Sequence, residues 1–251
     1  MAASKSADEL SAAAESDDWR TVAGLIDRCW IDLTLGGELE AMGNAVARMP
    51  EHELLRSVSA GLVAENIGRL DPGTIDYELP AAANELEAIG RSGDAHLALM
   101  RSLAAMAGRR RRGEHASAAE FARRGAVIAA AAEFAGFPDT DSLLPFWHLQ
   151  AGITAHLAGD DGLARRLHRA AYLGRDRSRF DIVGRDAAAN MALLEATAGN
   201  HLEARAWLDR AGEESHAPTW VDPLIGTTIS AAEGIVAWDR LDGDGIRTFV
   251  R

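Results

Sequence analysis

One helix–turn–helix unit occurs twice in succession between residues 147 and 212, and this repetition limits what the chain can fold into. Each copy has an Ala-Gly pair followed by two polar residues, with the glycine at Gly159 in the first copy and at Gly199 in the second. Glycine readily adopts the left-handed backbone conformation that ends many helices. The next residues, Asp160 and Asn200, are of the types that cap the start of a helix. Each copy therefore predicts two helices joined by a short turn.

Small residues lie at the same distances from both glycines. One lies seven residues before the glycine, one five residues after it and one twelve residues after it. Antiparallel helices approach each other closely where small side chains meet, so the pattern predicts close packing within each copy. The positions are Gly152, Ala164 and Ala171 in the first copy, and Ala192, Ala204 and Ala211 in the second.

The unit also recurs outside this stretch. A third copy begins at Gly113, and a weaker fourth lies near residues 241–246, in either of two registers that differ by one residue. The glycines at 113, 159 and 199 are 46 and 40 residues apart. A period in this range is typical of stacked helical pairs, which form a solenoid. The alternative is an alanine-rich helical bundle whose helices are similar by chance.

The composition favours helices throughout. Alanine is abundant, and alanine favours helices with thin contacts between them. Aromatic residues make up only 6% of the chain, and neither β-branched runs of strand length nor strict apolar–polar alternation occurs. We therefore predict an all-α fold built from antiparallel helix pairs.

No disordered linker interrupts the chain, so we predict a single helical-repeat domain over residues 1–251. Residues 1–92 form less regular N-terminal helices and residues 93–251 more regular repeats. The last repeat is incomplete, and because an array normally closes with a capping helix, we expect further sequence or another chain to cover it. Apolar spacing and breaker residues predict helices over 19–35, with Asp18 as N-cap, and over 38–49, 51–70, 81–90, 95–108, 116–135 and 220–240.

Several classes of function are disfavoured by composition. The net charge of −12 makes the chain a poor nucleic-acid binder. Cys29 is the only cysteine, which excludes an intrachain disulfide and a cysteine-based zinc site. Lys5 is the only lysine, so neither a phosphate-binding loop nor a Schiff-base site has a suitable lysine. With no signal peptide, membrane span or catalytic motif, we predict a soluble, cytoplasmic protein that is not an enzyme and uses no cofactor or metal.

The candidate binding residues begin with a basic run in a locally basic part of the chain, residues 101–180. The run is Arg109, Arg110, Arg111 and Arg112, at the end of a predicted helix. Basic groups are favourable at a helix C-terminus, so a solvated helix end is the first interpretation. Arginine also binds carboxylates and phosphates well, so the second interpretation is a site for an acidic partner or an anionic ligand. The third interpretation is contact with DNA. We expect the fold to survive replacement of all four by glutamine.

Trp147 and His148 complete the candidate site. They open the first clear copy of the unit. Most tryptophans of such a chain are expected in the core, but solenoids bind ligands in their concave groove. An aromatic side chain beside basic residues would suit a small effector or a peptide there.

A family resemblance is visible near the N-terminus. The acidic-Trp pair Asp18-Trp19, the pair Leu25-Ile26, the aromatic Trp30, the run Gly36-Gly37-Glu38-Leu39 and the terminal Met49-Pro50 follow one another at set spacings. This pattern resembles the opening of the MalT-like helical-repeat region of LuxR-type transcriptional regulators. The later Gly-polar-polar copies are similar to the tetratricopeptide repeats of those proteins, although their spacings exceed the usual 34 residues.

The resemblance implies a right-handed superhelix of tetratricopeptide-like helix pairs. It also implies a non-catalytic binding or sensing module, whose effector or protein partner lies in the groove and whose DNA-binding domain lies outside this chain. This segment would then contact no nucleic acid and no membrane, and could self-associate. The alternative is a free-standing tetratricopeptide-like scaffold for protein–protein interaction.

The close packing predicted at Ala164 and Ala204 gives a direct test. Replacing either alanine by leucine should push the two helices of its copy apart and lower the free energy of unfolding by about 1–3 kcal/mol through overpacking. Thermal melts of the two variants measure the effect. Melting temperatures equal to that of the parent would contradict the predicted pairing.

Overall fold

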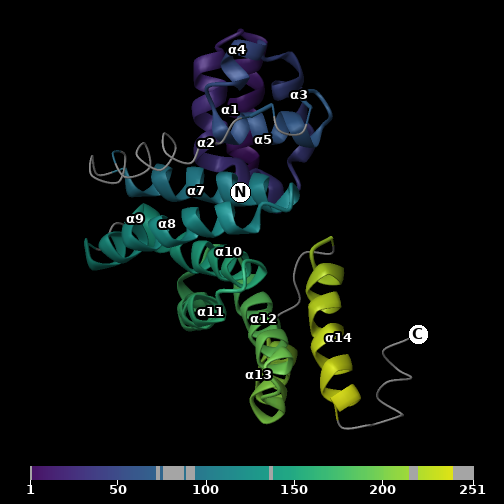
Figure 1. The fold of residues 1–251 in the computed structure, drawn as a ribbon. Coiled ribbons are helices and arrows are strands. Elements are labelled where there is room, and N and C mark those ends of the chain that lie inside the picture. The colour runs from purple at the N-terminus through teal and green to yellow at the C-terminus, as the bar shows by residue number, and fades with distance from the viewer. Residues whose placement is uncertain are drawn as a thin grey trace. The chain divides into compact units, whose positions relative to one another are not determined.

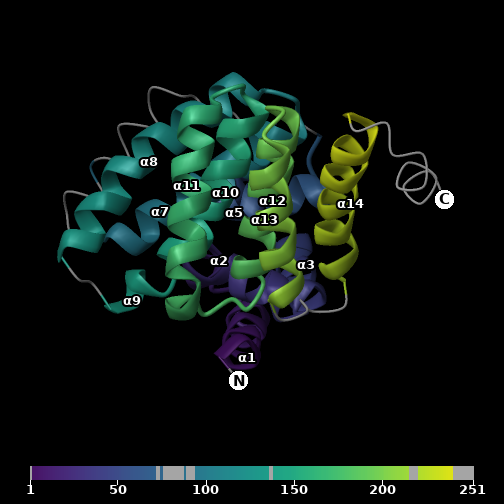
Figure 2. The same cartoon turned by 90° about the horizontal axis from the view of Figure 1, so that it is seen from below.

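The described residues of a computed structural model are 2–71, 74, 75, 88, 94–135, 138–214 and 220–239. All regular structure within them is helical, and they include no β-strand. The prediction of an all-α fold is confirmed, with helices that pack largely on their neighbours in sequence (Figures 1 and 2). In the same part of the chain, no helix is both long enough and apolar enough to cross a membrane.

Packing divides the chain into two compact units, residues 1–131 and 132–251. The first unit contains α1 (Ala2–Glu15), α2 (Trp19–Leu35), α3 (Leu39–Arg48), α4 (Glu51–Leu54), α5 (Val58–Asn66), α7 (Ala95–Arg111) and most of α8 (His115–Ala135). The second contains α9 (Pro138–Asp141), α10 (Leu144–Leu157), α11 (Asp161–Gly174), the 3-10 turn η1 (Arg175–Arg177), α12 (Val183–Thr197), α13 (His201–Glu213) and α14 (Asp222–Asp239). The single domain over residues 1–251 stays a prediction.

The predicted helices mostly agree with this order, but the one expected over residues 51–70 is wrong. It is two helices, α4 and α5, separated by residues 55–57. The Ser57 side chain accepts a hydrogen bond from the Ala60 backbone N–H and so caps α5. Its hydroxyl also donates to Asp27 of α2, at 2.7 Å. The break therefore serves a contact with a residue 30 positions away, which apolar spacing cannot reveal. The helix predicted over 81–90 and the fourth copy near 241–246 lie outside the described residues.

The predicted glycine turns are confirmed. Gly159 and Gly199 have φ angles of 80° and 77°, which an L side chain adopts only with strain. At Gly159, the glycine N–H donates to His156 and the next N–H, of Asp160, donates to Ala155, both at 2.9 Å. This pair of backbone hydrogen bonds is the Schellman motif, which provides donors for carbonyl groups that have no intrahelical partner at the helix end. The same pattern with positive φ occurs at Gly37, Gly68 and Gly113.

The residue after the glycine caps the next helix in one copy and not in the other. Asp160 accepts a hydrogen bond from the Leu163 N–H and caps α11, as predicted. The expected cap at Asn200 is wrong: this residue makes no side-chain cap and instead donates to Glu195, at 2.7 Å. Glu195 lies four residues before its glycine, where the first copy has Ala155. The identity of that one residue decides which way the turn side chain points.

The second unit contains the two clear copies of the unit, α10 with α11 and α12 with α13. Helices of each pair pack on each other, and α12 and α14 also pack on the preceding pair (Figure 1). Ala164 and Ala204 are completely buried, as close pairing requires. Tyr172 of α11 meets Trp207 of α13 edge to face, with ring centroids 5.2 Å apart. This aromatic contact connects the second helices of successive pairs.

Replacing glycine by alanine should have opposite effects on stability at the turn glycines and at a glycine within a helix. Gly159→Ala or Gly199→Ala should lower the free energy of unfolding by about 1–2 kcal/mol, because alanine is strained at positive φ. Gly212→Ala is the control: Gly212 lies in α13 without positive φ, and an added Cβ meets no atom within 4 Å. Alanine should stabilise α13 there by roughly 0.5–1 kcal/mol. Urea unfolding distinguishes the signs, and destabilisation by all three would refute the assignment.

Candidate binding site

The arginine run ends α7 within the first unit, and two of its members are held by the chain's own carboxylates. Arg109 is only 9% exposed, and its Nη1 lies 2.7 Å from Glu114 Oε2. Its guanidinium also lies 5.7 Å from the ring centre of Phe121 in α8, beside which α7 runs (Figure 1). Arg112 donates through Nε to Glu114, at 2.8 Å, and lies 3.7 Å from Glu65. Hydrogen bonding from Arg112 lowers the pKa of the Glu114 carboxyl, and burial opposes this effect.

This arrangement differs from the solvated helix end that the sequence favours. Only Arg111 is exposed, and Arg110 is partly buried. We no longer expect the fold to tolerate glutamine at all four positions, because neutralising Arg109 and Arg112 would leave the Glu65 and Glu114 carboxylates without these ion pairs. The ligand-binding role of the run stays a prediction, for which Arg110 and Arg111 present the accessible charge.

Trp147 and His148 lie in the second unit, on α10. Trp147 is completely buried, so its indole contributes to the core of this unit. His148 packs edge to face against it, with ring centroids 5.6 Å apart, and burial lowers the His148 pKa to about 4. Binding through these two side chains stays a prediction, and it requires movement of α10 before the indole can reach a ligand.

A buried histidine explains why one of the small positions is glycine. Gly152 lies on α10 four residues from both His148 and His156, and the His168 ring from α11 lies directly against it. A Cβ at position 152 would come within 2.7 Å of that ring. His168 is fully buried, and neither ring nitrogen has a hydrogen-bond partner within the described part of the chain. Burial and, to a smaller extent, the nearby His156 lower its pKa to about 3.

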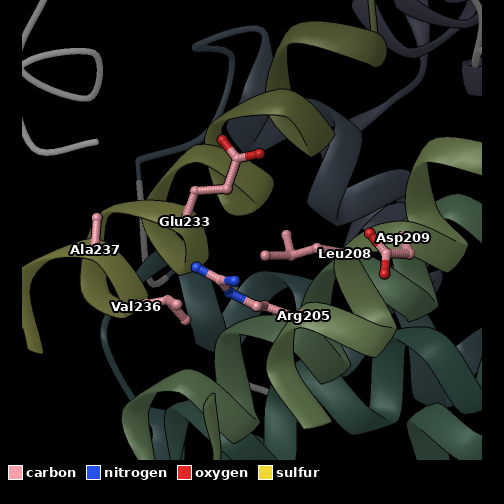
Figure 3. A pocket seen from close by; sticks show the side chains of 6 residues that line it. All are labelled: Arg205, Leu208, Asp209, Glu233, Val236 and Ala237. Atoms are coloured by element: carbon pink, nitrogen blue, oxygen red, sulfur yellow. The ribbon is translucent and has the colours of Figure 1, made fainter. Parts of the chain in front are cut away.

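The second unit also has an open groove that the sequence did not suggest. It lies between α13 and α14 and has a volume of about 390 Å³ (Figure 3). Its lining combines charged and apolar side chains: Arg205, Leu208 and Asp209 from α13, and Glu233, Val236 and Ala237 from α14. Figure 3 shows the Arg205 side chain reaching from α13 towards α14. The second helix of one pair and the helix that follows it therefore line one surface.

Comparison of the two copies shows what is special about this groove. Arg165 and Arg205 occupy the same position, six residues after Gly159 and Gly199. Arg165 reaches the following pair and donates to Glu195 of α12, at 2.6 Å. Arg205 is exposed and makes no such ion pair with a described residue. The repeated register of the two arginines is the sequence signal that could have identified this site.

The chemistry of the groove suits binding. Its lining residues offer a guanidinium, two carboxylates and apolar carbons, without a hydroxyl, thiol or imidazole that could act as a nucleophile. No group of three or more His, Cys, Asp or Glu residues in the described ranges could hold a metal ion. Searches of family models, curated proteins and solved structures found no match to this chain.

His168 makes the second unit sensitive to acid. Its pKa is about 6.5 when unfolded and about 3 in the fold, so its stabilising effect is complete above pH 6.5 and is lost as the pH falls towards 3. From this pKa difference, protonation of His168 in the unfolded chain lowers the free energy of unfolding by about 2 kcal/mol at pH 5.

His168→Leu should remove that part of the loss between pH 7.5 and pH 5.0, measured by urea unfolding at both values. Leu173→Ala provides the control: it alters an exposed leucine of the same helix and removes no titratable group, so its pH dependence should match that of the parent. An unaltered pH dependence in His168→Leu would show that this imidazole is not buried as described.

Proposed function

We propose that this chain is a non-catalytic binding or sensing module, built as a right-handed superhelix of tetratricopeptide-like helix pairs. In this proposal it is the effector- or partner-binding part of a LuxR-type transcriptional regulator that works in the cytoplasm. The Schellman turns at Gly113, Gly159 and Gly199 support the repeat architecture, because each places a second helix after the first by the same hydrogen bonds.

The observation that carries the binding role is the groove between α13 and α14. A ligand in it would contact Arg205 and Asp209 on one helix pair and Glu233 on the helix that follows. A ligand shifts an equilibrium between two conformations only as far as it binds one of them better. The groove lies between α13 and α14, so a change in the angle between these helices changes the spacing of its charged groups. A ligand that fits one spacing would therefore bind one conformation better than the other.

The DNA contact in such a regulator belongs to an attached reader, and this segment would make none of its own. The occupant of the groove would be a small effector or a peptide, and the binding signal would pass to the reader as a change in curvature or self-association of the helical array.

A free-standing scaffold is the second candidate, and the exposed apolar side chains of α14 favour it. Leu224 and Trp238 are 63% and 66% exposed, as is typical of a surface that binds another protein. Such a scaffold would bind its partner through these exposed side chains and would need no DNA reader.

Determining the gene sequence beyond the codon for Arg251 separates the two candidates. The regulator proposal predicts a continuous frame that encodes roughly 60–70 further residues with a helix-turn-helix pattern, enough for a small DNA-binding module. A stop codon immediately after Arg251 would contradict the regulator proposal and leave the scaffold.

A further inference from the structure

The groove lies at the second of two similar helix junctions in the second unit. In each junction the second helix of a pair packs on the helix that follows it, α11 on α12 and α13 on α14. Arg165 of α11 and Glu195 of α12 connect the first junction, with Nε 2.6 Å from Oε1. Arg205 occupies the equivalent position at the second junction, is exposed, and forms no ion pair with a described residue. The charge that connects the first junction is therefore available to a ligand at the second.

The two helices of the second junction run antiparallel. His201 is the first residue of α13 and Asp239 is the last residue of α14, and His201 Nε2 lies 3.3 Å from Asp239 Oδ2. A helix rises about 1.5 Å per residue, so Arg205 lies near the level of Val236 on the facing helix. Figure 3 agrees with this register, because the Arg205 guanidinium lies on the Val236 side of the groove. The groove is therefore positively charged towards the end where His201 meets Asp239.

Two carboxylates lie towards the other end of the groove. Asp209 follows Arg205 by four residues, so its Cα lies about 6 Å further along α13. Glu233 lies between these two levels, on the facing helix α14. Both carboxylates are exposed, and neither forms an ion pair within the described ranges. The groove thus has one positive end and one negative end.

The order of the charges along α13 keeps the two ends separate. Helical side chains lean towards the N-terminus of their helix, so the long side chain of Arg205 extends away from Asp209. A base four residues before an acid also pairs less well than an acid four residues before a base. Figure 3 shows Leu208 between the Arg205 guanidinium and the Asp209 side chain. Opposite charges are therefore exposed in one groove without neutralising each other.

The size of the groove limits the ligand that can contact both ends. Leu208, Val236 and Ala237 supply aliphatic carbons beside the charges, and the volume of about 390 Å³ is at the lower end of the range for small-molecule pockets. An extended peptide spans at most about 3.3–3.6 Å per residue, so the ammonium and carboxylate of a dipeptide lie about 7 Å apart. This distance is close to the helical turn between Arg205 and Asp209. The two charges of a single amino acid are closer together than this, and those of a tetrapeptide are about twice as far apart.

We propose that this groove binds a free dipeptide with aliphatic side chains. The inference rests on the proposed function, that of a binding or sensing module, and specifies the class of its effector. The terminal carboxylate accepts hydrogen bonds from the Arg205 guanidinium, and the terminal ammonium donates to Asp209 and Glu233. The aliphatic side chains pack on Leu208 and Val236. A purely anionic ligand is disfavoured, since two carboxylates outnumber the single guanidinium in the lining.

NMR titration of the isotope-labelled full chain with the dipeptide Leu-Leu tests the proposal. Saturable chemical-shift changes are expected at the backbone amides of α13 and α14 around Arg205, Asp209 and Glu233. Leu-Leu amide lacks the carboxylate and N-acetyl-Leu-Leu lacks the ammonium, so each should bind about three- to tenfold more weakly, as expected for partly exposed ion pairs. Free leucine and Leu-Gly-Gly-Leu, whose charges are spaced differently, should also bind more weakly than Leu-Leu.

Variants of the groove assign each end of the dipeptide. Arg205→Gln should weaken the binding of Leu-Leu about three- to tenfold without weakening that of Leu-Leu amide, which has no carboxylate for the guanidinium to bind. Glu233→Gln should weaken the binding of Leu-Leu without weakening that of N-acetyl-Leu-Leu. Both positions are exposed, so thermal melts of both variants should match the parent.

Two matched controls change the same chemistry elsewhere in the second unit. Arg166→Gln alters an exposed arginine of α11, and Glu203→Gln alters an exposed carboxylate of α13 outside the groove lining. Both should bind Leu-Leu as the parent does. Absence of Leu-Leu binding, chemical-shift changes centred outside α13 and α14, or equal binding by every variant would overturn the proposal.

Two further outcomes would also overturn it by identifying another occupant. Binding of Leu-Gly-Gly-Leu as tight as that of Leu-Leu would mean that the groove holds a longer peptide segment. Binding of free leucine as tight as that of Leu-Leu would mean that the ligand is a single amino acid. None of these results bears on the gene sequence beyond Arg251, so failure here is distinct from failure of the regulator proposal.

Discussion

Two hydrogen bonds around a left-handed glycine organise the repeats of this protein. At Gly159 and Gly199 the glycine N–H and the N–H that follows it close the end of one helix, and the next helix begins directly afterwards. Because the bonds are the same, the second helix leaves each turn in a similar direction. The small residues at Ala164 and Ala204 then lie where close packing needs them. Without the positive φ angle the turn, and with it the pairing, would have to change.

The sequence predicted features that depend on neighbouring residues and missed those that depend on distant ones. Gly113, Gly159 and Gly199 were identifiable because the left-handed conformation nearly requires glycine. The break at Ser57 could not be predicted, because it serves a contact with Asp27 of another helix. Asn200 is a different case, because Glu195 lies only five residues before it and directs its side chain through a local hydrogen bond.

The candidate site follows the same division. The arginine run is conspicuous in the sequence, but Arg109 and Arg112 form ion pairs with carboxylates of their own chain. The pairing with Glu65 depends on the fold. Arg205 was inconspicuous, and it matters because its counterpart Arg165 has an ionic partner on the next helix. Position within a repeat therefore separates an arginine that pairs with the next helix from one that does not do so among the described residues, which local charge density cannot do.

Residue-resolved amide hydrogen exchange of the full chain tests the central claim, that one hydrogen-bonded turn builds the repeats. The account predicts slow exchange for the N–H groups of Glu114, Asp160 and Asn200, because each donates to the carbonyl five residues before it. The N–H groups of Asp161 and His201, the first residues of the following helices, should exchange faster, since helix starts lack intrahelical partners. Fast exchange at Glu114, Asp160 and Asn200 would contradict the account.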